Sequence, residues 1–266
     1  MGKKAYLCIL KKTRMDNFIE KYLNKNNFER FEPLVALFDM DGVLYDSMWN
    51  HARSWHESMA HYGIPMTEMD AFRYEGMRGV ETIMHITRQH RGQAVSEAEA
   101  EEMYRYKTEC YRRKPVAPLI PGVHRLHETL HAMGVRIGVV TGSGQASLIG
   151  RILHDFSGLV SPEMIVTAHD VSRGKPAPDP YLMGMEKATR LLRAEGRIGK
   201  GDSVRPWQTI VFENAPLGVR AAVAARCLTL AVNTGPLPDD VLWDAGADVV
   251  VDTMQNATEL LSSVTE

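Results

Sequence analysis

The segment LVALFDMDGVLYD, residues 34–46, joins a continuous apolar run to two closely spaced aspartates. Its five consecutive apolar residues, bounded by Pro33 and Asp39, predict a short strand that is buried on both faces of a sheet. Asp39 and Asp41 follow where this strand leaves the sheet, and in open α/β sheets ligands bind at the carboxyl ends of the strands. The segment therefore predicts a parallel sheet with a polar site at the end of its first strand.

Similar apolar runs recur along the chain, at residues 135–140, 164–166, 209–212, 227–232 and 248–251. Helical patterns separate them, at residues 123–133, 145–153, 180–192, 217–225 and 254–261. Strands that alternate with helices indicate a parallel sheet with helices on both faces. The predicted fold class is therefore α/β, a doubly wound parallel sheet.

One interval breaks this alternation. Residues 47–117 contain only helical patterns, such as 48–62 and 97–113, and about seventy residues are too many for one crossover. We predict an inserted all-helical domain over 47–117, which leaves 31–46 and 118–266 to form the α/β core. The two links to the insert, at Asp46 and in the proline-rich segment 115–122, are predicted to form a hinge.

Residues 1–30 form a basic N-terminal extension that differs in composition from the rest. Within it the apolar residues Phe18, Ile19, Tyr22 and Leu23 have helical spacing, so we expect a short amphipathic helix that packs on the core.

The charge and cysteine content narrow the choice of partners. Lys and Arg total 31 against 33 Asp and Glu, a net charge of −2, so the chain lacks the basic field that holds nucleic acid. No apolar run approaches the roughly 18 residues that span a bilayer. Three cysteines without a CxxC motif fit reduced thiols. We expect a cytoplasmic monomer that contacts neither nucleic acid nor membrane.

Polar motifs also follow the later strands. Thr141-Gly-Ser-Gly-Gln145 opens a helix and is typical of a loop that binds an anion through main-chain N–H groups. Lys175 precedes a run of prolines, and the pair Glu213-Asn214 ends the fourth strand. A calcium-binding EF-hand loop is excluded because Val43 and Leu44 occupy loop positions 5 and 6, where a polar ligand and a glycine are required. The motif GxGxxG of dinucleotide-binding folds is incomplete.

The motifs DMDG, TGSG, GKPAPDPY and FENAPLGVRAA, in this order, closely resemble the four motifs of the haloacid dehalogenase superfamily. The resemblance covers residues 34–251. It extends to the branch with a helical cap inserted after the first motif, which contains beta-phosphoglucomutase and many small-molecule phosphatases. The resemblance implies a Rossmann-like core, a cap at residues 47–117 and phosphoryl transfer.

The resemblance also implies a role for each motif residue. Asp39 matches the nucleophile that forms an aspartyl-phosphate, and Asp41 matches the general acid and base. Thr141 and Lys175 match the groups that stabilise the transferring phosphoryl group. Because a dehalogenase lacks the second aspartate, Asp41 points to phosphoryl transfer and away from carbon–halogen cleavage.

Magnesium is the implied cofactor. By resemblance, Mg²⁺ is held by Asp39, the Asp41 carbonyl and the pair Glu213-Asn214. Many relatives have Glu-Asp at this pair, so Asn214 replaces an anionic ligand by a neutral amide. Asn214 either ligates the metal or caps the helix that begins at Ala215-Pro216, in which case Glu213 is the better ligand.

Residues that select the substrate are expected mainly in the cap. His51 matches a histidine beside the acid/base aspartate, or else is a polar residue on a cap helix. Glu75 and Arg78 lie in a segment that resembles the cap's substrate loop, where Glu75 would repel a second phosphate. Further candidate substrate contacts lie in the anion loop, at Gly142, Ser143 and Gln145.

Together these features predict a Mg²⁺-dependent phosphohydrolase that acts on a small phosphorylated metabolite or on pyrophosphate. The alternative is a sugar phosphomutase of the beta-phosphoglucomutase type, which shares all core residues and differs only in the acceptor of the phosphoryl group. A catalytically silent binding protein on the same fold is a third hypothesis, and the presence of the core residues argues against it.

Overall fold

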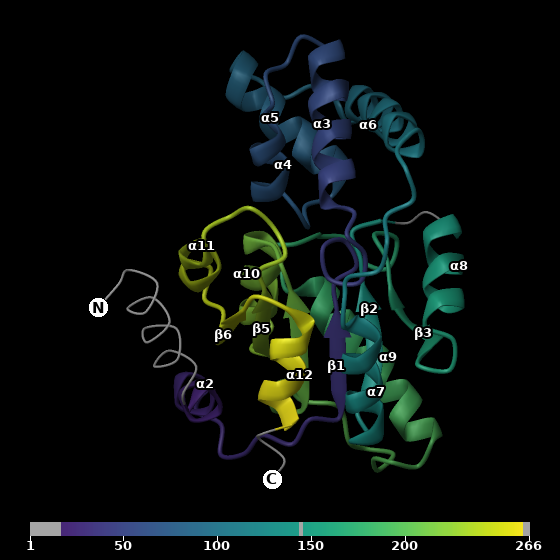
Figure 1. Ribbon diagram of the computed structural model, residues 1–266, viewed down its shortest axis with the longest axis vertical. Helices are drawn as coiled ribbons and strands as arrows, with labels where there is room; N and C mark the ends of the chain where they lie inside the picture. Colours follow the sequence, from purple (N-terminus) through teal and green to yellow (C-terminus); the bar gives the residue numbers. More distant parts are fainter. Residues whose placement is uncertain (1–16, 144–145, 263–266) are drawn as a thin grey trace.

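A six-stranded parallel sheet forms the centre of the computed structural model, which describes residues 17–143 and 146–262. The sheet order is β3-β2-β1-β4-β5-β6 (Figure 1). The strands are β1 Val35–Phe38, β2 Arg136–Val140, β3 Val160–Val166, β4 Thr209–Glu213, β5 Leu228–Val232 and β6 Val249–Val251. The predicted α/β class is confirmed, and β3 begins four residues earlier than its apolar run.

Helices cover both faces of the sheet. One face carries α7 Val123–Ala132, α8 Ala146–Asp155 and α12 Met254–Ser262, and the other carries α9 Asp179–Ala194, α10 Pro216–Ala224 and α11 Asp239–Asp244. A short 3₁₀ turn, η1 Pro206–Gln208, precedes β4. Because side chains alternate along a strand, Ala36 and Phe38 enter the first apolar cluster while Val35 and Leu37 enter the second. The six-residue helix α11 is too short to show a clear period and was not predicted.

Four helices between β1 and β2 lie beyond the carboxyl ends of the strands, at the top of Figure 1. They are α3 Met48–His61, α4 Glu68–Arg73, α5 Gly79–Arg91 and α6 Glu97–Arg112. Their apolar sides form a separate cluster around Trp55, Met59 and Ile83. Capping boxes begin α4 at Thr67 and α6 at Ser96. We refer to these helices as the cap.

The two chain links between core and cap run side by side. Asp46 donates its main-chain N–H to the Pro118 carbonyl at 2.9 Å, and Ile120 donates to the Leu44 carbonyl at 2.9 Å. Asn50 at the start of the cap donates its amide to the Pro115 carbonyl at 2.9 Å. These hydrogen bonds therefore join the outbound link to the return link.

The helix expected in the N-terminal extension is α2, Phe18–Asn26. Phe18 and Tyr22 are buried against the core, and the Tyr22 hydroxyl donates to the Arg226 carbonyl at 2.8 Å. Lys25 makes an ion pair with Asp248 at 3.1 Å. The apolar spacing thus predicted this docking correctly.

The described residues bear on the expectations about membrane-spanning helices and cysteines. Within 17–143 and 146–262, none of the helices has the length and apolar character needed to cross a membrane. Cys110 and Cys227 are buried free thiols, as expected, and Cys8 lies outside the described residues.

A buried histidine, His127, packs against Phe38 at the end of β1. His127 of α7 is fully buried between the rings of Phe38 and Phe156, at centroid distances of 4.3 and 4.7 Å. Neither of its ring nitrogens has a hydrogen-bond partner among the described residues. Burial, with a smaller contribution from His124, lowers the pKa of His127 to about 3. This histidine therefore stays neutral in the folded protein.

The free energy of unfolding should consequently fall in acid. The folded-state pKa lies below the unfolded value of about 6.5, so the unfolded chain gains a proton first and stability decreases as pH falls through 6.5. At about 1.4 kcal/mol per pH unit, His127 accounts for roughly 2 kcal/mol of the loss at pH 5. Urea unfolding of His127→Phe should lack this part of the loss. His131→Phe, on the exposed side of α7, is the matched control, and equal pH slopes for the two variants would contradict the assignment.

Candidate active site

The candidate site lies where the central strands end. β1 pairs with β2 on one side and β4 on the other, so the residues that follow these strands meet at one edge of the sheet. Asp39 donates its main-chain N–H to the Phe212 carbonyl at 3.0 Å, and Thr141 donates to the Val166 carbonyl at 2.9 Å. The ladders thus hold the backbone of both residues in register at the rim of the sheet.

A buried lysine joins two carboxylates at this rim. Lys175 Nζ lies 2.5 Å from Asp39 Oδ1 and 2.5 Å from Glu213 Oε1, and only 2% of its surface is exposed. The Tyr181 hydroxyl donates to the same Glu213 oxygen at 2.5 Å. Lys175 comes from the loop before α9, and the first turn of that helix supplies Tyr181. Three segments distant in sequence therefore meet around one ammonium group.

These contacts shift the pKa values of Lys175 and Asp39. Burial would lower the pKa of Lys175, but the carboxylates of Asp39 and Glu213 raise it above its ordinary value. Burial raises the pKa of Asp39 to about 7; Lys175 opposes this rise, and Glu213 and Asp41 add to it. Lys175 is therefore a permanent cation beside the predicted nucleophile.

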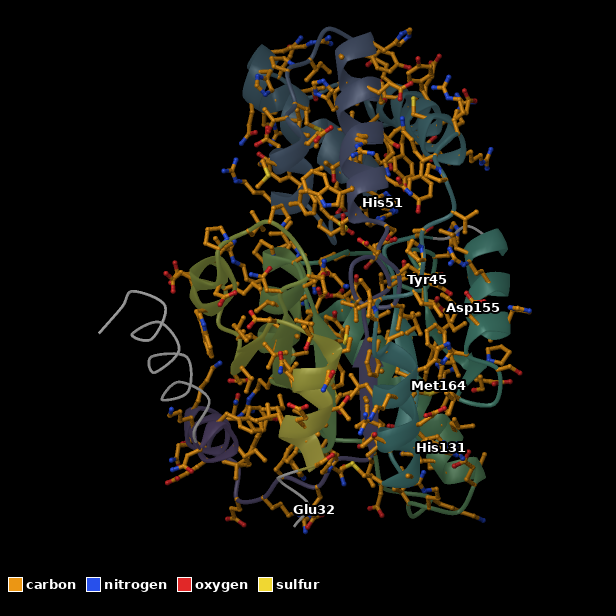
Figure 2. The ribbon with its side chains drawn as sticks, in the orientation of Figure 1. Glu32, Tyr45, His51, His131, Asp155 and Met164 are labelled. Atoms are coloured by element: carbon orange, nitrogen blue, oxygen red, sulfur yellow. The ribbon has the colours of Figure 1, made fainter. Side chains whose placement is uncertain are left out.

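Asp41 has a different set of partners, which come from the first helix of the cap and its N-cap. Ser47 donates to Asp41 Oδ1 at 2.5 Å, and His51 Nε2 lies 3.1 Å from the same oxygen. Figure 2 shows His51 at the lower end of the cap. Burial would raise the pKa of Asp41, but the contacts with His51 and Ser47 lower it below its ordinary value. The two aspartates thus have separate environments although they are two residues apart.

A second lysine, which sequence reasoning missed, completes this side of the site. Lys107 Nζ of α6 lies 2.7 Å from His51 Nδ1. Since an ammonium group can only donate, Nδ1 accepts and the proton of the imidazole lies on Nε2, facing Asp41. Burial lowers the pKa of Lys107 to about 8, against the opposing effect of Glu75 and Asp41. Burial and Lys107 also lower the pKa of His51.

The helical patterns of the sequence contain a signal for two site residues that were not predicted, Lys107 and Tyr181. Lys107 falls on the buried face of α6, among Ala100, Met103 and Cys110, where a cation needs a partner. Aromatic rings surround it, with the Trp55 ring centroid 5.0 Å from Nζ. Tyr181 similarly carries a hydroxyl on the buried face of α9. A charged or hydroxyl group at an apolar position of a helix was the available clue.

The fourth-motif pair, Glu213-Asn214, does not cap the helix that follows it. Both Glu213 oxygens are engaged, because Oε1 accepts from Lys175 and Tyr181 while Oε2 accepts the N–H groups of Asn214 at 3.1 Å and Ala215 at 3.4 Å. The N-cap of α10 is Ala215, and no side chain caps this helix. The interpretation of Asn214 as an N-cap is therefore wrong, and both oxygens of Glu213 already have protein donors.

The Asn214 side chain instead points at the first-motif loop. Its Oδ1 is buried and has no hydrogen-bond partner among the described residues. A Cβ on Gly42 would lie 2.0 Å from Asn214 Nδ2, so only glycine permits this approach, and its φ of +80° also favours glycine. A buried carbonyl oxygen without a donor is a typical ligand position for a hard cation.

The donor set fits magnesium. An Asp39 carboxylate oxygen, the Asp41 main-chain carbonyl and Asn214 Oδ1 are the oxygen donors that Mg²⁺ prefers. No cluster of three or more His, Cys, Asp or Glu side chains with metal-site geometry occurs in the described part of the chain.

The predicted substrate loop of the cap lies over the site. Glu75 is half-buried, and burial together with Asp41 and Asp39 raises its pKa to about 8. A Cβ on Gly76 would lie 3.0 Å from Lys175 Cδ, so the loop touches the core. Arg78 does not point at the aspartates: its guanidinium donates to the Ser172 carbonyl at 3.1 Å and joins cap to core.

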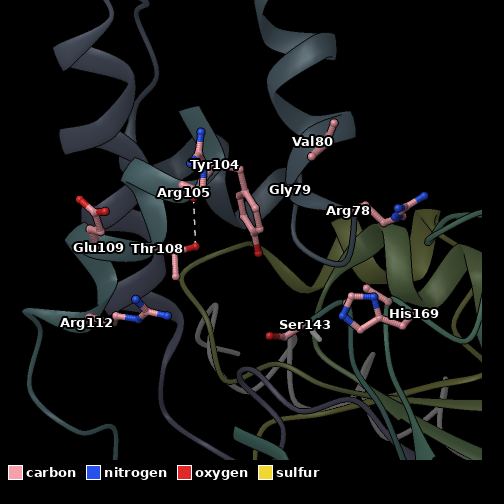
Figure 3. A pocket seen from close by; sticks show the side chains of 12 residues that line it. Arg78, Gly79, Val80, Tyr104, Arg105, Thr108, Glu109, Arg112, Ser143 and His169 are labelled. Atoms are coloured by element: carbon pink, nitrogen blue, oxygen red, sulfur yellow. Dashed lines mark hydrogen bonds between the residues drawn. The ribbon is translucent and has the colours of Figure 1, made fainter. Parts of the chain in front are cut away.

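A pocket of about 480 Å³ opens beside this loop (Figure 3). Tyr104 and Thr108 point into it from α6, opposite Ser143 and His169 of the core. The Ser143 main-chain N–H donates to Thr141 Oγ1 at 3.0 Å, so the pocket borders the predicted anion loop. Gly142 also lines it, whereas Gln145 lies outside the described residues. Arg78, Arg105 and Arg112 line the pocket against one acid, Glu109.

The comparisons with known proteins agree with this geometry. The profile of the family described as haloacid dehalogenase-like hydrolase matches residues 36–232, which include all four motifs. The chain belongs to this family. Its homologues are phosphatases of the haloacid dehalogenase type, so the chain is an enzyme of this class and the predicted family is confirmed.

Named relatives and one solved structure are similar over most of the chain. Hexitol phosphatase A from Escherichia coli is 30% identical and covers 84% of this chain and 92% of its own. A fructose-1-phosphate phosphatase from Escherichia coli is 28% identical, over 74% of this chain and 94% of its own. A structure from Bacteroides vulgatus, described as a candidate beta-phosphoglucomutase, is 38% identical with a TM-score of 0.85, covering 96% and 99% of the two chains.

Because Glu213 and Asn214 have different partners, we predict that substitutions at the two positions affect the Mg²⁺ requirement differently. Asn214→Ala would remove the candidate ligand Oδ1, so the Mg²⁺ concentration for half-maximal activity should rise about tenfold or more, and Asn214→Asp should lower it by adding charge. Glu213→Gln should reduce turnover through Lys175 with little change in the Mg²⁺ requirement. Titration of activity with Mg²⁺ and calorimetric Mg²⁺ binding to the free protein check this. Identical Mg²⁺ titrations for Asn214→Ala and the parent chain would contradict it.

Proposed function

We propose that this protein is a Mg²⁺-dependent phosphohydrolase that acts on a small phosphorylated metabolite through an aspartyl-phosphate on Asp39. The observation that carries the proposal is the separation of the two aspartates, one paired with Lys175 and the other with His51. A nucleophile and an acid/base group need separate environments, and here Asp39 is paired with Lys175 whereas Asp41 is bonded to Ser47 and His51.

In the first step an Asp39 oxygen attacks phosphorus, and the bond from phosphorus to the leaving oxygen breaks. Lys175 balances the charge of the carboxylate and the phosphoryl group, and the Thr141 hydroxyl and the loop N–H groups hold the phosphoryl oxygens. Asp41 gives its proton to the leaving oxygen. A dianionic phosphoryl group beside Asp41 favours uptake of that proton before the step.

In the second step water replaces the leaving group, and Asp41, now a carboxylate, takes a proton from it while the water oxygen attacks phosphorus. Inorganic phosphate leaves and Asp39 is regenerated. The proton that His51 directs at Asp41 stabilises its carboxylate form, which suits the base role. When bound, Mg²⁺ would supply positive charge that screens the phosphoryl oxygens from the aspartates.

The pocket supports a phosphorylated metabolite with a polar body. Its volume of about 480 Å³ suits a small molecule, and its arginines favour an anionic one. The relatives named as hexitol phosphatase and fructose-1-phosphate phosphatase support a polyol or sugar phosphate. Pyrophosphate is the other substrate to test, although Glu75 would repel a second phosphoryl group unless a cation lies between them.

A sugar phosphomutase is the second candidate, and the similarity to the Bacteroides vulgatus structure favours it. It would use the same first step, with a sugar hydroxyl in place of water as the acceptor. Against it, Arg78 is occupied by the Ser172 carbonyl and is not directed at a second phosphate.

A panel of sugar, polyol and nucleotide phosphates and pyrophosphate, with Mg²⁺, tests the proposal. Free phosphate should appear in a one-to-one ratio with dephosphorylated product. Asp39→Asn should abolish turnover while the melting temperature stays close to that of the parent, because the side chains are nearly isosteric. Phosphate release by that variant at the parent rate would overturn the covalent step, and an isomerised sugar phosphate in excess of phosphate would favour the mutase.

A further inference from the structure

Helix α8 connects the anion loop with both links of the cap. It begins at Ala146, three residues after Ser143, and runs to Asp155. Two side chains in its second half, Arg151 and Asp155, are one turn apart and bonded to each other at 3.1 Å, Nε to Oδ2. Both reach the links near Tyr45 and Ala117.

Arg151 contacts each link. Its Nη2 donates to the Ala117 carbonyl of the return link at 2.6 Å. Its guanidinium carbon lies 4.0 Å from the centroid of the Tyr45 ring, on the outbound link, in a cation–π contact. One side chain of α8 therefore holds the two segments that enter and leave the cap.

Tyr45 in turn closes the loop that carries Asp41. Its side chain is 3% exposed and donates to Asp155 Oδ2 at 3.1 Å, and the two residues lie next to each other in Figure 2. Its main chain accepts from Gly42 N–H at 2.7 Å and donates to the Met40 carbonyl at 3.1 Å. The ring of Tyr45 is thus attached to α8 while its backbone completes the turn around Asp41.

We propose that Tyr45, Arg151 and Asp155 are positioning residues that set the place of the general acid Asp41 relative to the phosphoryl group. The reason is that α8, which follows Ser143 closely in the chain, also holds the Tyr45 ring of the loop that carries Asp41. Loss of the cluster would leave the Asp41 loop with its main-chain bonds and the Asp41 side chain with its contacts to Ser47 and His51 of the cap, but without the tie to α8. The inference rests on the proposed function, since it takes Asp41 as the proton donor.

A displaced acid has a specific kinetic signature. Protonation of the leaving oxygen matters for an alkyl phosphate, whose alkoxide is a poor leaving group, and little for p-nitrophenyl phosphate, whose phenolate leaves unprotonated. The ratio kcat/KM reports the steps up to the first irreversible transfer to Asp39. A positioning role therefore lowers kcat/KM for the alkyl substrate selectively, while a general loss of folded enzyme lowers both alike.

The experiment compares glycerol 1-phosphate with p-nitrophenyl phosphate, both with Mg²⁺, for Tyr45→Phe, Arg151→Leu and Arg151→Lys. We expect kcat/KM on glycerol 1-phosphate to fall about tenfold or more in the first two variants, with less than about threefold change on p-nitrophenyl phosphate. Arg151→Lys keeps a donor for Ala117 and should recover part of the loss. The control is Arg136→Leu, which breaks the bidentate pair with Glu195 at the opposite end of β2. It should leave kcat/KM unchanged for both substrates.

Equal losses on the two substrates in Tyr45→Phe, which deletes one hydroxyl and so should fold, would overturn the positioning role. An unchanged kcat/KM on both substrates would overturn it as well. Failure of the proposed function has another result: Asp39→Asn would keep its turnover, or Asp41→Asn would show no selective loss on the alkyl substrate. The two failures are therefore distinguishable.

Discussion

The contact of Lys175 with Asp39 and Glu213 is the interaction on which the site depends. Two carboxylates gathered at the buried rim of a sheet repel each other and lose their hydration, so they need a cation placed between them. Lys175 supplies it at 2.5 Å from each, and Tyr181 and two main-chain N–H groups satisfy the remaining Glu213 lone pairs. The topology makes this possible because β1 and β4 are neighbours and end together.

Because Lys175 is bonded to Asp39, the proposed nucleophile, Asp41 depends on other groups, and these come from the cap. Ser47 donates directly to Asp41, and Lys107 contacts His51, which in turn contacts Asp41. Lys107 itself lies among three aromatic rings. The cap therefore supplies the side-chain partners of Asp41 as well as lying over the site. It follows that a cap displaced from the core would leave Asp39 with its partners and remove most of those of Asp41.

The change from an acidic residue to Asn214 has a physical consequence for the site. Three carboxylates, Asp39, Asp41 and Glu213, already lie at this edge, with Glu75 approaching from the cap, and burial together with neighbouring carboxylates raises the pKa of both Asp39 and Glu75. A neutral amide adds an oxygen donor without adding to that repulsion. The price is a smaller attraction for a divalent cation.

The amino-acid sequence by itself determined the sheet, the helices of the core, the position of the helical insert and the family, because these depend on local periods and on motifs of adjacent residues. Asp39, Asp41, Thr141 and Lys175 could be proposed as site residues for the same reason, because each belongs to one of these motifs. Tertiary structure alone decided that Glu213 supports Lys175 and that Asn214 Oδ1 has no donor among the described residues. It also decided that Lys107 reaches His51 and that Arg151 reaches Tyr45 of the Asp41 loop. These contacts join residues some 38 to 106 positions apart. Nothing in the local pattern specifies them, since they follow from the packing of α6 and α8 against the links between core and cap.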